Sequence, residues 1–169
     1  MRRATHKYGI EIPTSIAHAK ELDRKNGNTL WQDALAKEMT NISIAFDIQD
    51  HGVKPPPGWT KISGHLTWDL KMDFTRKARW VKDGHKCPTP KTSNYAGVVS
   101  RESVRIAFTY AALNGLDVVA ADFLNAYLQA PTSKKHYVIC GDEFGEEHNG
   151  KVALITRALY GSVYAGRDY

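Results

Sequence analysis

Residues 65–82 read HLTWDLKMDFTRKARWVK, and this stretch decides the kind of fold that the chain adopts. In its first half Leu66, Trp68 and Leu70 alternate with polar residues, which is typical of a strand with one buried face. A short turn follows, and a second strand is expected from about residue 76 to residue 82, before an Asp-Gly pair. The stretch therefore predicts a β-hairpin.

The hairpin is also basic. Lys77 and Arg79 lie two residues apart, so on a strand their side chains share one face. Two cations on one face can hold a triphosphate, and Lys71 can join them across the hairpin. A second interpretation stays open on these residues alone, because a solvated basic edge also discourages strand pairing.

The segment before the hairpin divides into an arm and a helix. Residues 1–27 are polar and show no clear period, so we expect an arm or linker that can be disordered by itself. From Asn28 onward apolar residues recur at helical spacing, beginning with Trp31, and Asn28 or Thr29 can cap a helix. We expect this helix at about residues 29–41.

Two features follow the hairpin. Residues 84–99 carry prolines and no period, so they predict a loop long enough to contact another group. Ser100 can then cap a helix over residues 101–114, which Gly115 would end. Apolar residues cover more than half the circumference of this helix, so we expect it to be largely buried.

Residues 117–123 read DVVAADF, a continuous apolar run typical of a central strand buried on both faces. Asp122 stands near its far end. Burying a carboxylate costs several kcal/mol unless a metal, a base or hydrogen bonds offset the cost. The alternative is an ordinary strand-end acid that caps the following turn.

The remaining segments complete an α+β pattern. A turn or short helix is expected at residues 124–129, strands at about 137–140 and 152–156, and an acidic solvated loop at 141–150. The order helix, hairpin, helix and three strands indicates an α+β fold with one globular unit over residues 28–169.

Composition limits the class of protein. The 169 residues are 42% hydrophobic and 24% charged, enough for the core of one domain without a disulfide or structural metal. Cys87 and Cys140 lack the spacing of a zinc site, and we expect reduced, intracellular thiols. No apolar run approaches the roughly 20 residues that cross a bilayer, and the start lacks the apolar run of a signal peptide, so no membrane partner and no secretion are expected. A net charge of +5 suits a polyanionic partner, although moderate basicity is also common in proteins that bind none.

Residues 121–128, ADFLNAYL, resemble a motif of copia-type retrotransposon reverse transcriptases that reads roughly Asp-Val-x-x-Ala-Phe-Leu. Three more segments are similar to that family in the same order: Trp31-x-x-Ala34-x-x-x-Glu38, KARWV at 77–81 and ALYG at 158–161. The resemblance covers about residues 28–169. It implies the fingers and the first half of the palm of a right-hand polymerase, with an incomplete palm sheet.

The resemblance also implies roles for single residues. Asp122 would bind two Mg²⁺ ions, with the carbonyl of Phe123 as a second oxygen donor. Lys77 and Arg79, with Lys71, would hold the triphosphate of a deoxynucleotide. The implied partners are this nucleotide and an RNA or DNA template-primer.

Two further roles follow from the same resemblance. Tyr127 would lie under the sugar and exclude a 2′-hydroxyl, where the family more often has Phe. Gly161 would allow a close approach of the backbone to the template or the incoming base.

The sequence departs from the family in one decisive respect. The family's Tyr-x-Asp-Asp hairpin has no match in these 169 residues, and one carboxylate is a poor site for two Mg²⁺ ions. SVYAG at residues 162–166 also replaces the family's usual Leu-Lys-Gln-Ala-Pro. We therefore expect a reverse transcriptase fragment, truncated at its C-terminus and inactive unless the missing palm, thumb and ribonuclease H segments are supplied. The alternatives are a non-catalytic nucleic-acid-binding remnant and an inert product whose exposed sheet edge aggregates.

Overall fold

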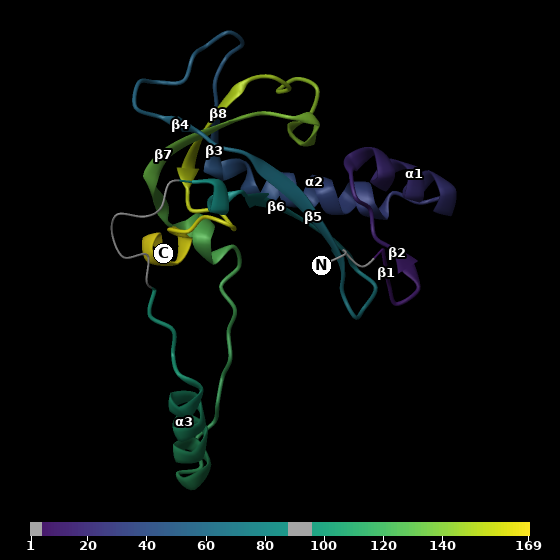
Figure 1. Cartoon of the computed structure of the whole chain (residues 1–169). Helices are drawn as coiled ribbons and strands as arrows, with labels where there is room; N and C mark the ends of the chain where they lie inside the picture. The colour runs from purple at the N-terminus through teal and green to yellow at the C-terminus, as the bar shows by residue number, and fades with distance from the viewer. Residues whose placement is uncertain (1–4, 88–95) are drawn as a thin grey trace.

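The computed structural model describes residues 5–87 and 96–169, and its helices and strands are arranged as Figure 1 shows. In chain order they are β1 (His6–Lys7), β2 (Ile10–Glu11), α1 (Ile16–Asn26), α2 (Leu30–Ile42), β3 (Phe46–Ile48), β4 (Thr60–Lys61), β5 (Gly64–Leu70), β6 (Arg76–Lys82), α3 (Arg101–Leu113), β7 (Pro131–Ile139), β8 (Val152–Arg157) and α4 (Ala165–Asp168). Short 3₁₀ turns lie at Ser43–Ala45, Gly84–Lys86, Ala126–Gln129 and Asp142–Phe144. The described chain thus combines helices with separate sheets, as expected of a mixed α and β protein.

The predicted hairpin is confirmed. β5 and β6 pair antiparallel in a register that places Leu66 opposite Trp80 and Leu70 opposite Arg76. The turn between them is closed by a hydrogen bond from the Lys71 N–H to the Thr75 carbonyl, 3.0 Å. Because successive side chains of a strand point to opposite faces, Ala78, Trp80 and Lys82 of β6 are buried on one face.

The predicted helix is confirmed as α2. Its N-terminus is capped from outside the helix, because the buried carboxylate of Asp23 accepts hydrogen bonds from the backbone N–H of Trp31 (3.1 Å) and of Gln32 (2.9 Å). These are two of the backbone donors that the first turn of a helix leaves unpaired. The cap ties α2 to the segment that precedes it.

Residues 1–27 are expected to form an arm or linker that can be disordered by itself, and residues 5–27 of it contain regular structure. This segment contains the β1–β2 hairpin and α1, while residues 1–4 lie outside the described residues. α1 is capped by the Ser15 hydroxyl at its start and by Gly27 in the left-handed conformation at its end. Its apolar side is narrow, with Ala19 and Leu22 packed against Trp31, which explains why no period is visible in a mostly polar sequence.

A four-stranded sheet in the order β3-β8-β7-β4 forms the other half of the molecule. β8 lies between β3 and β7 and pairs antiparallel with both, whereas β4 joins β7 in parallel. Ile155 and Leu159 belong to the main core, together with Trp80 of the hairpin. The rings of Phe46 and Phe144 lie edge-on to Trp80, with centroids 5.3 and 6.3 Å away. The core therefore joins the hairpin to the sheet and fixes the position of β6.

α3 forms where it was predicted, but its expected burial is wrong. The helix projects from the rest of the molecule between two extended segments (Figure 1), and among its side chains only Ala111 is buried. Its boundaries are set locally, by the Ser100 hydroxyl at the N-cap and by Gly115 at φ +63° after its end. Burial instead requires a neighbouring element, and no described helix or strand packs along most of the length of the projecting α3.

The expected central strand at residues 117–123 is also absent. Among residues 5–87 and 96–169 the segment has no strand partner, and its side chains are exposed, with Val119 at 90%. A strand needs a neighbouring backbone to pair with, and this segment leads back from the projecting α3 without lying beside a strand (Figure 1). The other expected strands are confirmed as β7 and β8, and the expected turn at 124–129 contains the 3₁₀ turn Ala126–Gln129.

Three smaller expectations concern the loop, the thiols and the membrane. Of the predicted loop at 84–99, residues 88–95 lie outside the described residues. Cys87 and Cys140 are both free. Within residues 5–87 and 96–169, no helix is long and apolar enough to cross a membrane.

Candidate functional site

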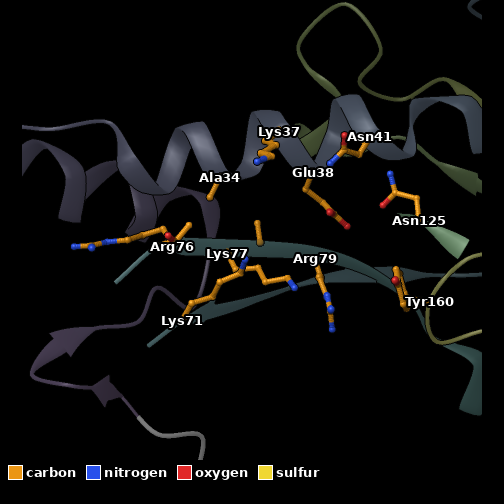
Figure 2. A pocket seen from close by; sticks show the side chains of 12 residues that line it. Ala34, Lys37, Glu38, Asn41, Lys71, Arg76, Lys77, Arg79, Asn125 and Tyr160 are labelled. Carbon is orange, nitrogen blue, oxygen red and sulfur yellow. The ribbon is translucent and has the colours of Figure 1, made fainter. Parts of the chain in front are cut away.

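A cavity of about 230 Å³ lies between α2 and the β5–β6 hairpin (Figure 2). It is lined by Ala34, Lys37, Glu38 and Asn41 of α2, by Lys71, Thr75, Arg76, Lys77, Ala78 and Arg79 of the hairpin, and by Asn125 and Tyr160. Five of these residues are cations and one is an acid. The cavity is therefore a strongly basic site.

Strand geometry brings together the three cations that were predicted to bind a triphosphate. Lys77 and Arg79 alternate with the buried Ala78 and Trp80, so their side chains emerge on the same face of β6. Lys71 reaches the same cavity from the turn that follows β5. The predicted shared face is thus confirmed, and Lys71 joins it.

These cations repel one another. Burial lowers the pKa of the Lys77 ammonium, and the nearby charges of Arg79 and Lys71 lower it further. Within the residues that the structure describes, Lys71, Lys77 and Arg79 have no carboxylate within 4 Å. An anion with several charges would relieve this repulsion.

The acid that lines the cavity is Glu38. It points from α2 toward β6 (Figure 2), where its carboxylate accepts a hydrogen bond from the Trp80 backbone N–H at 3.0 Å. Burial raises the pKa of Glu38, and the Trp80 N–H and the charges of Arg79 and Lys77 oppose that rise. The carboxylate is thus fixed against the strand that carries the cations.

The ring of Tyr160 lies at one end of the cavity (Figure 2). The Arg79 guanidinium lies 5.1 Å from the ring centroid of Tyr160, within the range of a cation–π contact. Tyr127 packs edge-on against Tyr160, with centroids 5.3 Å apart, and against Tyr169 at 6.1 Å. Tyr127 therefore lies next to the basic cavity without lining it.

Asp122 and Phe123 are not brought to this site. Both are exposed in the segment that leads back from α3, Phe123 at 72%, and neither lines the cavity. In the described part of the chain no three His, Cys, Asp or Glu side chains gather as a metal site would require. The side chains present do not fit a pair of Mg²⁺ ions, which need several oxygen ligands.

Gly161 makes a close backbone approach, but to the chain's own strand. Its φ is +81°, and a Cβ atom there would collide with the carbonyl oxygen of Lys82 and with Val81. The neighbouring Tyr160 carbonyl accepts a hydrogen bond from the Lys82 N–H at 2.9 Å. In this structure the glycine lets the segment after β8 lie against β6, which positions Tyr160 at the cavity.

Sequence reasoning gave no site role to the helix side of the cavity. Ala34, Lys37, Glu38 and Asn41 have the spacing i, i+3, i+4 and i+7 of one helical face. That spacing indicates a shared face, but it does not indicate that the face lies over the basic strand. Asn125 and Tyr160 carried no comparable signal, because they come from distant parts of the chain.

No protein-family model matches the chain, and no curated protein or solved structure matches it.

Proposed function

We propose that the cavity between α2 and the hairpin binds the phosphates of a deoxynucleotide, and that the chain is a front fragment of a copia-type RNA-directed DNA polymerase. The observation that carries the proposal is the meeting of Lys71, Lys77 and Arg79 in one cavity. The cavity is lined by five cations and one carboxylate, and such an excess of positive charge favours a ligand with several negative charges. A triphosphate is such a ligand.

The aromatic end of the cavity supports a nucleotide over a simple polyphosphate. Tyr160 lines the cavity beside Arg79, and Tyr127 packs on Tyr160. Bases and sugars stack on aromatic rings, while phosphates pair with cations. The two kinds of side chain stand next to each other here, as a nucleotide requires.

Binding, and not turnover, is the activity that these side chains support. Asp122 lies outside the cavity, and among the described residues no group of three or more His, Cys, Asp or Glu side chains gathers as a metal site would require. The proposed fragment therefore binds nucleotide without extending a primer by itself. Polymerisation would need carboxylates from another part of the polymerase.

The first test measures binding of a deoxynucleoside triphosphate by titration calorimetry. The double variant Lys77→Ala/Arg79→Ala should lose at least about tenfold in affinity, because each charge-assisted hydrogen bond contributes about 1.5–3 kcal/mol. Lys54→Ala is the matched control, since Lys54 is exposed and does not line the cavity. Equal affinity of the double variant and the control would exclude the cavity as the binding site.

A second test concerns the polymerase assignment itself. In a longer chain that carries a Tyr-x-Asp-Asp hairpin, Asp122→Asn should abolish primer extension and leave nucleotide binding by Lys77 and Arg79 intact. Unchanged extension would remove Asp122 from the catalytic role.

A non-catalytic nucleic-acid-binding remnant is the second candidate, and the same cavity favours it, because successive phosphates and bases of a single strand can use the cations and Tyr160. Binding to a labelled single strand would then fall steeply with salt and be indifferent to Mg²⁺. A free triphosphate would bind much more weakly than the strand. A preference for the triphosphate would instead favour the polymerase fragment.

A further inference from the structure

Glu38 is the one carboxylate among the described residues that line this basic cavity. It lines the same cavity as Lys71, Lys77 and Arg79, and it is half-buried between α2 and β6. Because its carboxylate accepts the Trp80 backbone N–H at 3.0 Å, it is attached to the strand that carries the cations. A solvated surface acid could turn away from an arriving anion, but this one would have to give up its hydrogen bond first.

We propose that Glu38 sets the affinity of this cavity for phosphate groups, acting as a fixed counter-charge with which a bound anion must compete. The inference rests on the proposed function, in which the cavity holds the phosphates of a nucleotide. Glu38 is thereby a residue that tunes affinity and not one that contacts the ligand favourably.

The sign of the effect follows from the charges that face the carboxylate. Lys77 and Arg79 of β6 are the cations whose charges act on the Glu38 carboxylate. Lys37 of α2, Lys71 of the turn after β5 and Arg76 of β6 line the same cavity. Without a ligand, Glu38 moderates the repulsion among these cations. With a phosphate chain bound, the carboxylate and the ligand repel each other, so its charge weakens binding.

The same arrangement makes binding depend on pH. The cations that face Glu38 are lysines and arginines, which stay charged at neutral and mildly acidic pH, and no histidine is among the described lining residues. Burial raises the pKa of Glu38 above its usual value, although the Trp80 N–H and the charges of Arg79 and Lys77 oppose that rise. As the pH falls, Glu38 is protonated, the counter-charge disappears, and anion affinity rises.

Glu38→Gln tests the proposal, because the glutamine amide oxygen can still accept the Trp80 N–H while the charge is lost. Glu102→Gln is the matched control: it removes the same charge from the exposed surface of α3, away from the cavity. Calorimetry with inorganic tripolyphosphate at fixed salt and pH 7.5 should show Glu38→Gln binding about three- to tenfold tighter than the wild type. Glu102→Gln should stay within about twofold.

Sulfate, whose own charge is constant from about pH 5 to pH 8, provides the pH series. Wild type and Glu102→Gln should bind sulfate more tightly as the pH falls, and Glu38→Gln should show a clearly smaller increase. If the melting curve shows that Glu38→Gln does not fold, the change of sulfate affinity with pH is compared among the other three proteins. The wild type and Glu102→Gln should show the same increase at low pH. Lys77→Ala/Arg79→Ala should lose this increase together with the site.

The outcomes separate the two proposals. Tripolyphosphate binding that Glu38→Gln leaves unchanged or weakens overturns the role of Glu38 and leaves the phosphate site standing. If no variant binds tripolyphosphate, or if Lys77→Ala/Arg79→Ala binds it as well as the wild type, the phosphate site is overturned. The role of Glu38 is then overturned with it.

Discussion

Buried polar side chains join the hairpin to the sheet at the scale of single residues. The ammonium of Lys82, at the end of β6, lies 2.8 Å from Nδ1 of His136 on β7, and both side chains are buried. A lysine can only donate, so Nδ1 of His136 accepts and the imidazole is neutral. Burial lowers the pKa of Lys82, and burial together with the Lys82 charge lowers the pKa of His136 to about 4.

This pair predicts a loss of stability in mild acid. The pKa of His136 is about 4 in the folded chain and about 6.5 in an unfolded chain, so the unfolded state binds the proton first. The stability that depends on the neutral imidazole is complete above about pH 6.5 and is lost as the pH falls toward 4, by up to about 3 kcal/mol. Urea unfolding at pH 7.5 and pH 5 measures it.

His136→Gln isolates the contribution, because the glutamine amide oxygen can accept a hydrogen bond from the Lys82 ammonium and glutamine does not titrate. The variant should lose less stability than the wild type between pH 7.5 and pH 5, whereas His51→Gln, at an exposed histidine of the β3–β4 loop, should behave as the wild type. Equal slopes for all three proteins would show that His136 is not the group responsible.

At the scale of elements, α2 lines one side of the cavity and also contacts both α1 and the β5–β6 hairpin. Its start is fixed by Asp23 of α1 and its middle by the bond between Glu38 and the Trp80 N–H of β6. Trp31 packs edge-on against Trp68 of β5, with centroids 5.9 Å apart. The orientation of the cavity's helix face is thus decided by neighbouring elements at the start and in the middle of the helix.

We expect Asp23→Ala to destabilise the protein by about 1–3 kcal/mol, since it leaves the N–H groups of Trp31 and Gln32 without their acceptor. The loss should appear as a lower urea midpoint with an unchanged slope. Asp33→Ala is the control within the same helix, because the exposed Asp33 carboxylate accepts a hydrogen bond from the exposed Thr29 hydroxyl, and its cost should be smaller. Equal costs would mean that the cap from α1 contributes nothing specific.

At the scale of the whole molecule, the main core lies between the hairpin and the sheet, and α3 stands apart from them (Figure 1). Many of its large apolar side chains are exposed, among them Ile106, Phe108 and Leu113. A helix of 13 residues is marginal in water without packing. The described structure therefore contains regions of very different local stability.

Amide hydrogen exchange should reveal this difference directly. We expect the amides of α3 to exchange much faster than those of β8, whose first four residues are buried and which pairs with strands on both sides. The amides of α2 should be intermediate and should become faster in Asp23→Ala. Protection of α3 equal to that of β8 would show that the helix is packed against a partner in solution.

The hairpin, α2, α3, β7 and β8 could all be predicted from the sequence, because alternation, helical spacing, capping residues and turn residues act over a few neighbours. The same local geometry predicted that Lys77 and Arg79 share a face. α1 was missed, since its buried side is too narrow to produce a visible period and depends on Trp31 to complete it. The expectation of a strand at 117–123 was wrong. An apolar run shows only that a segment can form a strand when a partner strand lies beside it.

Only the tertiary structure decided which helix face covers the basic strand, that Tyr160 returns to the same cavity, and that Asp122 lies outside it. These are relations between residues far apart in the chain, and the cost of closing the intervening loops is repaid only by contacts that no local pattern displays. By itself the sequence determined the hairpin, α2, α3, β7 and β8, and the positive charge of one strand face. Long-range packing and strand pairing determined that this charge lines a cavity with a carboxylate inside it.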